Sequence, residues 1–385
     1  MNRLEDALRE TFGSDLDTRD GPTAAGVRHA VRRRRTTRTV VGASAAVALV
    51  AVTAAALGLR DDGDRSPTPT PRPTQTITDA RAALSSALTV ESADGALFAT
   101  TDDPACDCSI LLRHDGVAWT RLHAFPVPFV DRVALTPDGR AGWAAADGKV
   151  WSTHDGGSTW ADVPLDSRAD GDLTDSYLVA ASSSYAWLVN LADGSLWRSP
   201  VGSDDFQQFA VPGESGTSAL DTRVQDIRVI GDSVVADLAP TGEGNVTSAP
   251  KVADSEGIGW RELPRPCTGD TRLLASDDAA FVICPDVGKP EATIYRWRTG
   301  DDEFTGFANE SLPPGTEVAP LSADRVLALG DQDRVVTSQG AVAADLPRGP
   351  ETFVWDTARL GDRTYLATTD GLFESTDDGR TWHRI

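Results

Sequence analysis

The sequence is poor in positive charge and contains very little lysine. Its 385 residues hold 36 Lys and Arg against 58 Asp and Glu, which gives a net charge of −22. Only three of the basic residues are lysine: Lys149, Lys251 and Lys289. Proteins that bind nucleic acid by neutralising phosphates need a basic surface. The composition therefore argues against a nucleic-acid partner.

Methionine and cysteine are also scarce, whereas turn-forming residues and tryptophan are plentiful. There are one Met and four Cys, but 34 Gly, 23 Pro and 10 Trp. Glycine and proline favour turns, and aromatic residues favour strands. This mixture predicts many short strands rather than long helices. The length is compatible with two ordinary domains or with one large β-rich domain.

One stretch of the chain, residues 40–59, is uncharged and 20 residues long. As a helix it spans about 30 Å, the thickness of a bilayer core. Residues 1–39 carry nine Arg and six acidic residues, a net of +3, which leaves −25 for residues 40–385. By the positive-inside rule, we expect 1–39 to be a cytoplasmic basic stub and 40–59 a single transmembrane helix at the plasma membrane. Residues 60–385 are then extracellular.

A cleaved signal peptide is the main alternative for this stretch, since Ala56-Leu57-Gly58 is a small-x-small sequence. A signal core usually has 7–15 residues behind a short basic leader. Because this core has 20 residues and the leader has 39, we favour the anchor. Residues 60–78 are predicted to be a Pro/Thr-rich linker. Alternating prolines in 66–74 favour an extended polyproline II conformation.

Two segments share the pattern Ser/Thr-x-Asp-x-Gly-x-Thr-Trp. The first is formed by Thr153, Asp155, Gly157, Thr159 and Trp160, and the second by Ser375, Asp377, Gly379, Thr381 and Trp382. Weaker copies end at Trp119 and at Trp260, and the copy at Trp260 lacks the Asp in the pattern. This motif resembles the Asp-box, or BNR repeat, of β-propellers in the superfamily of sialidase-like, sortilin-like and photosystem II assembly-factor-like proteins.

The spacing of these tryptophans indicates the number of repeats. Trp119 and Trp160 are 41 residues apart, Trp160 and Trp260 are 100 apart, and Trp260 and Trp382 are 122 apart. These separations fit six intervals of about 40–50 residues, and therefore seven units. The resemblance implies an all-β fold, a seven-bladed β-propeller over residues 79–385. Within the second unit, strands are expected at 132–136, 141–145 and 149–153.

The chemistry of the Asp-box favours a structural role. Its Asp and Ser/Thr side chains can bond backbone amides and close a tight turn, and its Gly tolerates a positive φ. We therefore expect Asp155 and Asp377 to stabilise turns rather than to act as catalytic acids.

Four cysteines follow the uncharged stretch, and they allow three pairings. A hairpin at 272–284 would bring Cys284 back to the end where Cys267 enters, so a Cys267–Cys284 disulfide is favoured. Cys106 and Cys108 can form a short bridge in an oxidising exterior. Zinc is disfavoured because the spacing is short and no ligand partner is evident. We expect no metal site and no cofactor.

The catalytic residues of sialidases are not recognisable. The chain has no Arg-Ile-Pro sequence, and none of its four tyrosines matches the nucleophile of that family by motif. No catalytic residue is therefore assigned. The preferred hypothesis is a non-catalytic module that binds a protein, peptide or glycan outside the cell. A sialidase-type glycoside hydrolase is one alternative. A sensor that signals through a short helix at residues 2–12 is another.

One further pattern indicates a surface feature. Tyr295 and Trp297 alternate with Arg296 and Arg298, so the aromatic and the basic side chains should lie on opposite faces of a strand. The simpler interpretation is a buried aromatic pair with arginines at the rim. The functional interpretation is an arginine-lined patch for an anionic ligand.

Overall fold

The computed structural model describes most of the chain after residue 75. The described residues are 75–77, 83–103, 105–165, 176–209, 222–240, 250–264, 266–267, 272–285, 291–308, 311–313, 315–349 and 352–385. All of them belong to the compact unit Thr68–Ile385. The predicted stub, transmembrane helix and most of the linker lie outside the described residues. Within the described part of the chain, no helix has the length and apolar character needed to cross a membrane.

The described residues form seven antiparallel sheets, each built from consecutive strands. Such sheets arise because Asp-Gly and similar turns separate short strands with buried, apolar residues. Blades 1 to 3 comprise β1 (Gln75–Thr76), β2 (Ala87–Ala93), β3 (Ala96–Asp103), β4 (Cys108–His114) and β5 (Trp119–Phe125); β6 (Arg132–Leu135), β7 (Gly142–Ala146), β8 (Lys149–Thr153) and β9 (Ala161–Asp162); and β10 (Tyr177–Ala181), β11 (Tyr185–Asn190), β12 (Leu196–Pro200) and β13 (Gln207–Phe209).

Blades 4 to 7 repeat this arrangement with four strands each. Their strands are β14 (Thr222–Ile230), β15 (Ser233–Pro240), β16 (Lys251–Asp254) and β17 (Arg261–Glu262); β18 (Arg272–Ser276), β19 (Ala279–Pro285), β20 (Ala292–Arg298) and β21 (Thr305–Gly306); β22 (Glu317–Ser322), β23 (Arg325–Leu329), β24 (Arg334–Thr337) and β25 (Gly340–Ala343); and β26 (Val354–Leu360), β27 (Arg363–Thr368), β28 (Gly371–Ser375) and β29 (His383–Arg384).

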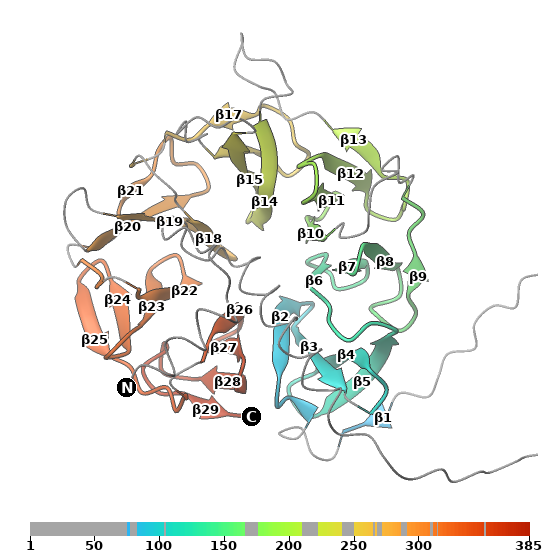
Figure 1. Cartoon of the computed structure of the whole chain (residues 1–385), viewed down its shortest axis with the longest axis horizontal. Helices are drawn as coiled ribbons and strands as arrows, with labels where there is room; N and C mark the ends of the chain where they lie inside the picture. Colours follow the sequence, from blue (N-terminus) through green and yellow to red (C-terminus); the bar gives the residue numbers. More distant parts are fainter. Residues whose placement is uncertain are drawn as a thin grey trace, which may run out of the picture. The chain divides into compact units, whose positions relative to one another are not determined.

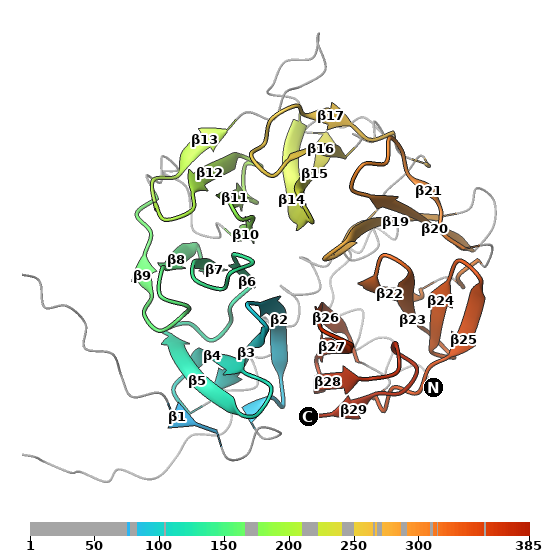
Figure 2. The same cartoon turned by 180° about the vertical axis from the view of Figure 1, so that it is seen from behind.

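The seven sheets are arranged as the blades of a ring, with the first strand of each four-stranded meander innermost (Figures 1 and 2). Each innermost strand contacts the innermost strands of the two neighbouring blades. These strands are β2, β6, β10, β14, β18, β22 and β26. The fold is therefore a seven-bladed β-propeller, as the tryptophan spacing predicted.

Apolar side chains fill the spaces between neighbouring blades. Among the described residues there are seven hydrophobic clusters, one at each blade–blade interface. Trp143 and Trp187 are completely buried in two of them. Burial of apolar area at about 25 cal/mol per Å² makes these interfaces the main source of stability in the described ring.

The ring closes between blade 7 and blade 1 without a shared strand among the described residues. Blade 7 takes all four of its strands, β26–β29, from the end of the chain. Closure depends on a hydrophobic cluster that joins Leu84 and Leu97 to Tyr365 and Leu372. Blade 1 has an additional outer strand, because β1 pairs with β5. β1 lies within residues 60–78, the predicted linker.

The even number of strands in each meander distinguishes the two faces of the ring. A chain that crosses a blade four times in antiparallel strands leaves on the face where it began. Connections between blades therefore lie on one face, which we call the connection face. The turns between the first and second strands, and between the third and fourth, lie on the other face. We call this second face the Asp-box face, because it carries residues 153–160 and 375–382.

Candidate binding site on the propeller axis

Five charged side chains from four innermost strands lie close together near the propeller axis. We call them the axial charge cluster: Glu91 on β2, Arg132 on β6, Asp226 and Arg228 on β14, and Asp356 on β26. Asp226 and Arg228 are two residues apart on one strand and so share a face. The innermost strands of blades 1, 2, 4 and 7 thus each contribute at least one ionisable group.

Two of the carboxylates are positioned by the same local structure. The strand register shifts between Val224 and Asp226 in β14, and between Val354 and Asp356 in β26. Such bulges change the direction of the following side chain and are common beside functional sites. Each aspartate then accepts a hydrogen bond from the next backbone N–H, at 2.8 Å for Asp226 and 3.0 Å for Asp356. The repeated Val-x-Asp sequence is the signal that could have identified both residues.

Asp226 is the centre of the cluster. Its Oδ1 lies 3.2 Å from Nη1 of Arg132, and its Oδ2 lies 3.0 Å from Nε of Arg228. Arg132 Nη1 also donates to the carbonyl oxygen of Ile227 at 3.2 Å. Both carboxylate oxygens of Asp226 are therefore occupied by guanidinium groups of this chain. On the other side of the cluster, Asp356 Oδ2 accepts a hydrogen bond from the backbone N–H of Val90 at 3.3 Å.

The side chains of the cluster are largely shielded from solvent. The exposed fractions are 11% for Arg132, 18% for Asp226 and 27% for Arg228. Burial alone would raise the pKa of Asp226, but the charges of Arg228 and Arg132 outweigh it and hold that pKa below its usual value. Asp226 is therefore a stable anion between two cations.

The other two carboxyl groups have raised pKa values. Burial is the main cause for Glu91, and the negative charges of Asp277 and Asp356 add to it, so its pKa is well above the usual value. Burial also raises the pKa of Asp356, although Arg228 and Arg132 oppose the shift. Both groups therefore take up a proton at a higher pH than an ordinary carboxylate does.

Asp277 extends this region at the turn between β18 and β19. Its pKa is raised to about 6 by burial, and then by the charges of Asp278 and Asp356, while Arg359 opposes the shift. The residue keeps an exposed surface, so part of this repulsion is screened by water.

The arrangement of the cluster disfavours acid–base catalysis. A glycosidase needs a carboxylic acid with a raised pKa and a second carboxylate that is free to act as base or nucleophile. Glu91 and Asp356 meet the first condition. Asp226 is the ionised partner, but both of its oxygens are held by Arg132 and Arg228. The guanidinium groups thus neutralise a carboxylate of this chain instead of facing an open site.

The predicted Asp-box residues lie away from this cluster, in the turns β8–β9 and β28–β29 of the Asp-box face. In the first turn, Asp155 accepts hydrogen bonds from Thr159 N at 2.8 Å and from Thr159 Oγ1 at 2.7 Å. Thr153 Oγ1 accepts one from Gly157 N at 3.0 Å, and Trp160 Nε1 donates to the Gly157 carbonyl at 3.0 Å.

The second turn repeats these contacts. Asp377 accepts hydrogen bonds from Thr381 N at 2.8 Å and Thr381 Oγ1 at 2.7 Å. Ser375 Oγ accepts one from Gly379 N at 2.9 Å, and Trp382 Nε1 donates to Gly379 O at 2.8 Å. In both turns the polar groups of the motif are used within the turn itself.

The copy that ends at Trp260 has an aspartate that the pattern did not identify. Asp254 Oδ1 accepts hydrogen bonds from Ile258 N at 2.7 Å and from Glu256 N at 3.0 Å. The contact between Asp254 and Ile258 spans four residues, as does the contact between Asp155 and Thr159. Trp260 then follows one residue later than in the complete motif. This extra residue explains why matching by fixed spacing missed Asp254.

The predicted cysteine and arginine features lie on other parts of the propeller. Cys106 is joined to Cys108, and Cys267 to Cys284, by disulfides. Arg296 and Arg298 both contact the carboxylate of Asp324. These two arginines are therefore paired within the chain, while Trp297 between them is completely buried.

A cavity of about 390 Å³ lies on the Asp-box face between blades 1 and 2. Charged groups of both signs line it, together with the aromatic rings of Phe98 and His154. The lining residues are Asp94, Phe98, Arg113, Asp138, Gly139, Arg140, His154, Asp155 and Gly156. Asp138 and Asp155 already accept hydrogen bonds within their own turns.

Comparison with known proteins shows the fold and leaves the family open. No model of a protein family matches the chain. No curated protein matches its sequence. Among solved structures, the chain is similar to YCF48 bound to D1 peptide, with a TM-score of 0.50 and 13% identity over 79% of this chain and 96% of that chain.

Two other propellers have comparable similarity. One is the β-propeller domain of the Trilobed protease from Pyrococcus furiosus, which has an open velcro topology. Its TM-score is 0.50, with 8% identity over 76% of this chain and 96% of that chain. The other is the GH74 xyloglucanase from Xanthomonas campestris, with a TM-score of 0.53 and 16% identity over 80% of this chain and 55% of that chain. Identities this low establish a common fold only.

Proposed function

We propose that this protein is a membrane-anchored extracytoplasmic β-propeller that binds a protein or peptide and catalyses no reaction. The observation that carries the proposal is that both oxygens of the Asp226 carboxylate are paired with arginines. The ionised carboxylate of the axial charge cluster is neutralised by Arg132 and Arg228 of the same chain, so it is not available for chemistry. The similarity to YCF48 bound to D1 peptide supports a peptide as the ligand.

The membrane location is part of the same proposal. Residues 40–59 have the length of a transmembrane helix, and the preceding residues carry the positive charge expected on the cytoplasmic side. All four cysteines follow this stretch and are paired as disulfides. Disulfides persist in oxidising compartments, which supports placing the propeller outside the cytoplasm.

The charge of the chain indicates a basic partner. Residues 40–385 carry a net charge of −25, and a field of this sign attracts cationic ligands and speeds their association. Within the axial charge cluster, burial raises the pKa values of Glu91 and Asp356, and nearby acidic groups add to the shift of Glu91. A lysine or arginine side chain of a peptide near these two groups would favour their ionised forms.

A binding experiment tests this proposal directly. The full chain in lipid nanodiscs is titrated with 12-residue peptides that are basic, neutral or acidic but otherwise matched. We expect the basic peptide to bind at least tenfold more tightly than the acidic one, and the difference to shrink with added salt. The double variant Glu91→Gln/Asp356→Asn should reduce that preference. Asp362→Asn, on an exposed turn of blade 7, is the control. Equal binding of all three peptides would contradict the proposal.

The hydrolase alternative has its own measurement. The same preparation is incubated with xyloglucan oligosaccharides and with fluorogenic sialic-acid substrates. We expect product formation to equal that of empty nanodiscs. Hydrolysis that disappears in Glu91→Gln would instead identify the axial charge cluster as an active site.

The proposed topology is tested separately with epitope tags at the two ends of the chain. On intact cells, antibody should reach a tag after Ile385 and should not reach a tag before Met1 until the membrane is permeabilised. The opposite labelling pattern, or release of the propeller into the medium, would show that the anchor is wrong.

A further inference from the structure

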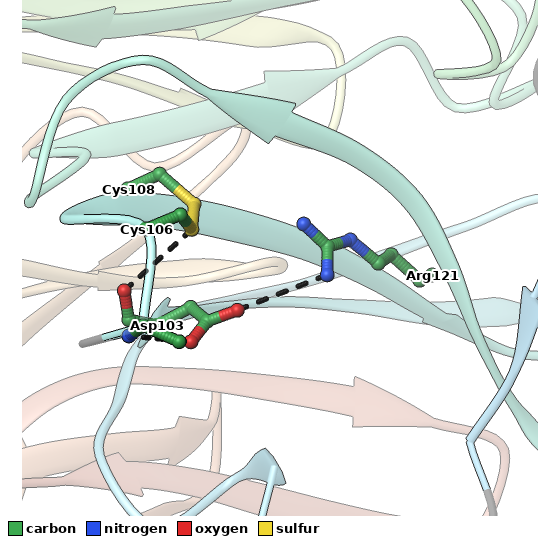
Figure 3. Close-up of a disulfide and its surroundings, with 5 residues drawn as sticks. Asp103, Cys106, Cys108 and Arg121 are labelled. Carbon is green, nitrogen blue, oxygen red and sulfur yellow. Dashed lines mark hydrogen bonds and ion pairs between the residues drawn. A yellow bond between two sulfur atoms is a disulfide. The ribbon is translucent and has the colours of Figure 1, made fainter. Parts of the chain in front are cut away.

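The two disulfides of the propeller differ in their exposure. Cys106 lies on the exposed turn between β3 and β4, while Cys108 at the start of β4 is 6% exposed (Figure 3). Cys284 is 2% exposed, and Cys267 packs against the hydrophobic cluster between blades 4 and 5. A thiolate from solvent can therefore reach the sulfur of Cys106 more easily than either sulfur of the other pair.

The surroundings of Cys106 also accommodate its reduced form. Cys106 Sγ lies 3.6 Å from the backbone carbonyl oxygen of Asp103 (Figure 3). A disulfide sulfur has no hydrogen, so this approach is only a contact in the oxidised protein. After reduction, the thiol of Cys106 can donate a hydrogen bond to that carbonyl. The pairing of Asp103 with Cys108 across β3 and β4 does not require the disulfide.

The ring that this bridge closes is very small, because Asp107 is the one residue between the two cysteines. Asp107 has a φ of +51°. Aspartate visits this left-handed conformation more readily than most residues do, and Asp94, Asp147 and Asp378 adopt it in turns that hold no disulfide. The restriction on Asp107 therefore comes from the size of the ring. The Cys267–Cys284 pair is separated by 17 positions, so it imposes no comparable restriction.

We propose that Cys106 and Cys108 form a thiol–disulfide exchange site that accepts two electrons from a dithiol. A substrate thiolate attacks Cys106 Sγ, a bond forms between the substrate sulfur and Cys106, and Cys108 leaves as a thiolate. The second substrate thiolate then attacks the first substrate sulfur and displaces Cys106. The substrate is oxidised to a disulfide, and its two protons pass through solvent to Cys106 and Cys108. This activity is additional to the proposed binding function and does not depend on it.

Charge around the site selects the kind of thiol. Asp102, Asp103 and Asp107 surround the two cysteines, and Arg121 Nη1 is 3.8 Å from Asp103 Oδ2. The charged residues around the two cysteines thus include three acidic side chains and one arginine. An anionic thiol is repelled by such a loop, whereas a thiol beside basic groups is attracted. The substrate that fits is a dithiol flanked by positive charge.

The first test compares the two disulfides within one molecule. The full chain in detergent is equilibrated without oxygen in mixtures of reduced and oxidised dithiothreitol, quenched in acid, alkylated and analysed by peptide mass spectrometry. EDTA is included because ligand atoms of Asp103, Cys106 and Cys108 lie within 4.8 Å of one another and could hold a metal once reduced. We expect Cys106–Cys108 to be half reduced at a ratio of reduced to oxidised reagent at least tenfold lower than Cys267–Cys284.

Two outcomes of this titration would overturn the proposal. In the first, both pairs are reduced together. In the second, Cys106–Cys108 resists reduction longer than Cys267–Cys284. Because the second pair serves as an internal control, no variant has to fold for the result to be decisive.

The second test examines the order of attack and the charge preference. In Cys108→Ser, the remaining Cys106 should form a mixed disulfide with cystamine at least tenfold faster than the remaining Cys108 does in Cys106→Ser. For the wild-type chain, cationic cysteamine should reduce Cys106–Cys108 several-fold faster than anionic glutathione at equal thiolate concentration. Equal rates for the two variants, or faster reduction by glutathione, would refute the assigned site.

Discussion

Arg132 of blade 2 reaches Asp226 of blade 4, with Nη1 of the arginine 3.2 Å from Oδ1 of the aspartate, although blade 3 lies between these blades in the ring. The contact thus joins two blades that share no interface. On the opposite side of the axis, the backbone of Val90 in blade 1 donates to Asp356 of blade 7. Polar contacts near the axis therefore supplement the seven apolar interfaces between neighbouring blades.

Removal of the Asp226 carboxylate should destabilise the propeller strongly. Asp226→Ala leaves Arg132 and Arg228 as shielded cations without their central anion, which costs about 3–5 kcal/mol. The matched control is Asp324→Ala, because Asp324 pairs with Arg296 and Arg298 but is itself 65% exposed. The control should cost at most about 1 kcal/mol. Urea unfolding followed by tryptophan fluorescence measures both, and equal losses would contradict the assigned importance of the axial contacts.

The Asp-box of blade 7 should contribute measurably to stability. Asp377→Ala removes the acceptor for the backbone N–H and the hydroxyl of Thr381. The expected loss is about 1–3 kcal/mol, since the backbone donor is left without its protein partner. Asp362→Ala, on an exposed turn of the same blade, should change the free energy of unfolding by less than about 0.5 kcal/mol. A loss in Asp362→Ala as large as that in Asp377→Ala would refute this role.

Asp277 should make the propeller less stable as the pH rises. Its pKa in the folded protein is about 6, above the value of about 4 for an unfolded chain. Between these two values the folded state binds more protons, so the contribution of this group is greatest below about pH 4 and falls until about pH 6. At pH 8, Asp277→Asn should therefore be more stable than the wild type, by about 1 kcal/mol after allowance for solvent screening.

The measurement for Asp277 is the urea midpoint of both proteins at pH 4, 6 and 8. The difference between them should grow mainly from pH 4 to pH 6 and level off above pH 6, once Asp277 is fully ionised in the folded protein. A difference that is the same at all three pH values would show that Asp277 does not titrate in this range.

Closure of the ring should be sensitive to Gly371. This glycine has a φ of +126°, and a Cβ there would lie 2.9 Å from the carbonyl oxygen of Leu84 in the segment that leads into blade 1. Gly371→Ala should cost about 2 kcal/mol or more, because it adds a clash to the backbone strain. Gly361→Ala, with φ +63° and open space around the added Cβ, should cost only about 1 kcal/mol.

Hydrogen exchange distinguishes a local effect of Gly371→Ala from a general one. If the clash acts on ring closure, amides of β2 and β26 should exchange faster than those of β10 and β14. Uniform acceleration across the ring would contradict this explanation.

Much of the fold could be predicted because the turn motifs and strand patterns that determine it are short segments of sequence that recur from blade to blade. Each turn motif places its own Trp within one residue of the same distance from its Asp, so the intervals between Trp119, Trp160, Trp260 and Trp382 give the number of blades. Strands expected at 132–136 and 149–153 agree with β6 and β8. Here, alternation and turn residues determine pairing between neighbours in the sequence.

The axial charge cluster could not be predicted in the same way. Its members lie at positions 91, 132, 226, 228 and 356, on four different blades, and only the closed ring brings them together. A charged residue on an innermost strand looks like any other polar residue until its neighbours across the axis are known. The Val-x-Asp sequences of β14 and β26 are a clue that becomes meaningful only once both are seen to follow a β-bulge.

The way in which the ring closes could not be predicted from the sequence either. Whether blade 7 borrows a strand from the start of the chain depends on contacts between Leu84 and Leu372, which lie almost 290 residues apart. Local patterns contain no information about a pairing at that distance. The same applies to β1, whose two residues join blade 1 although they lie in a segment with the composition of a linker.

Each described blade is made from consecutive strands, and no strand is exchanged between the first blade and the last. The ring therefore has no structurally privileged starting point. Blade 1 comes first only in the order of translation. The interface between blades 7 and 1 has the same construction as the other six, a cluster of apolar side chains between two sheets. A gene that began at any other blade and joined the present ends would therefore encode the same ring, and duplication or loss of a whole blade would leave every remaining sheet intact.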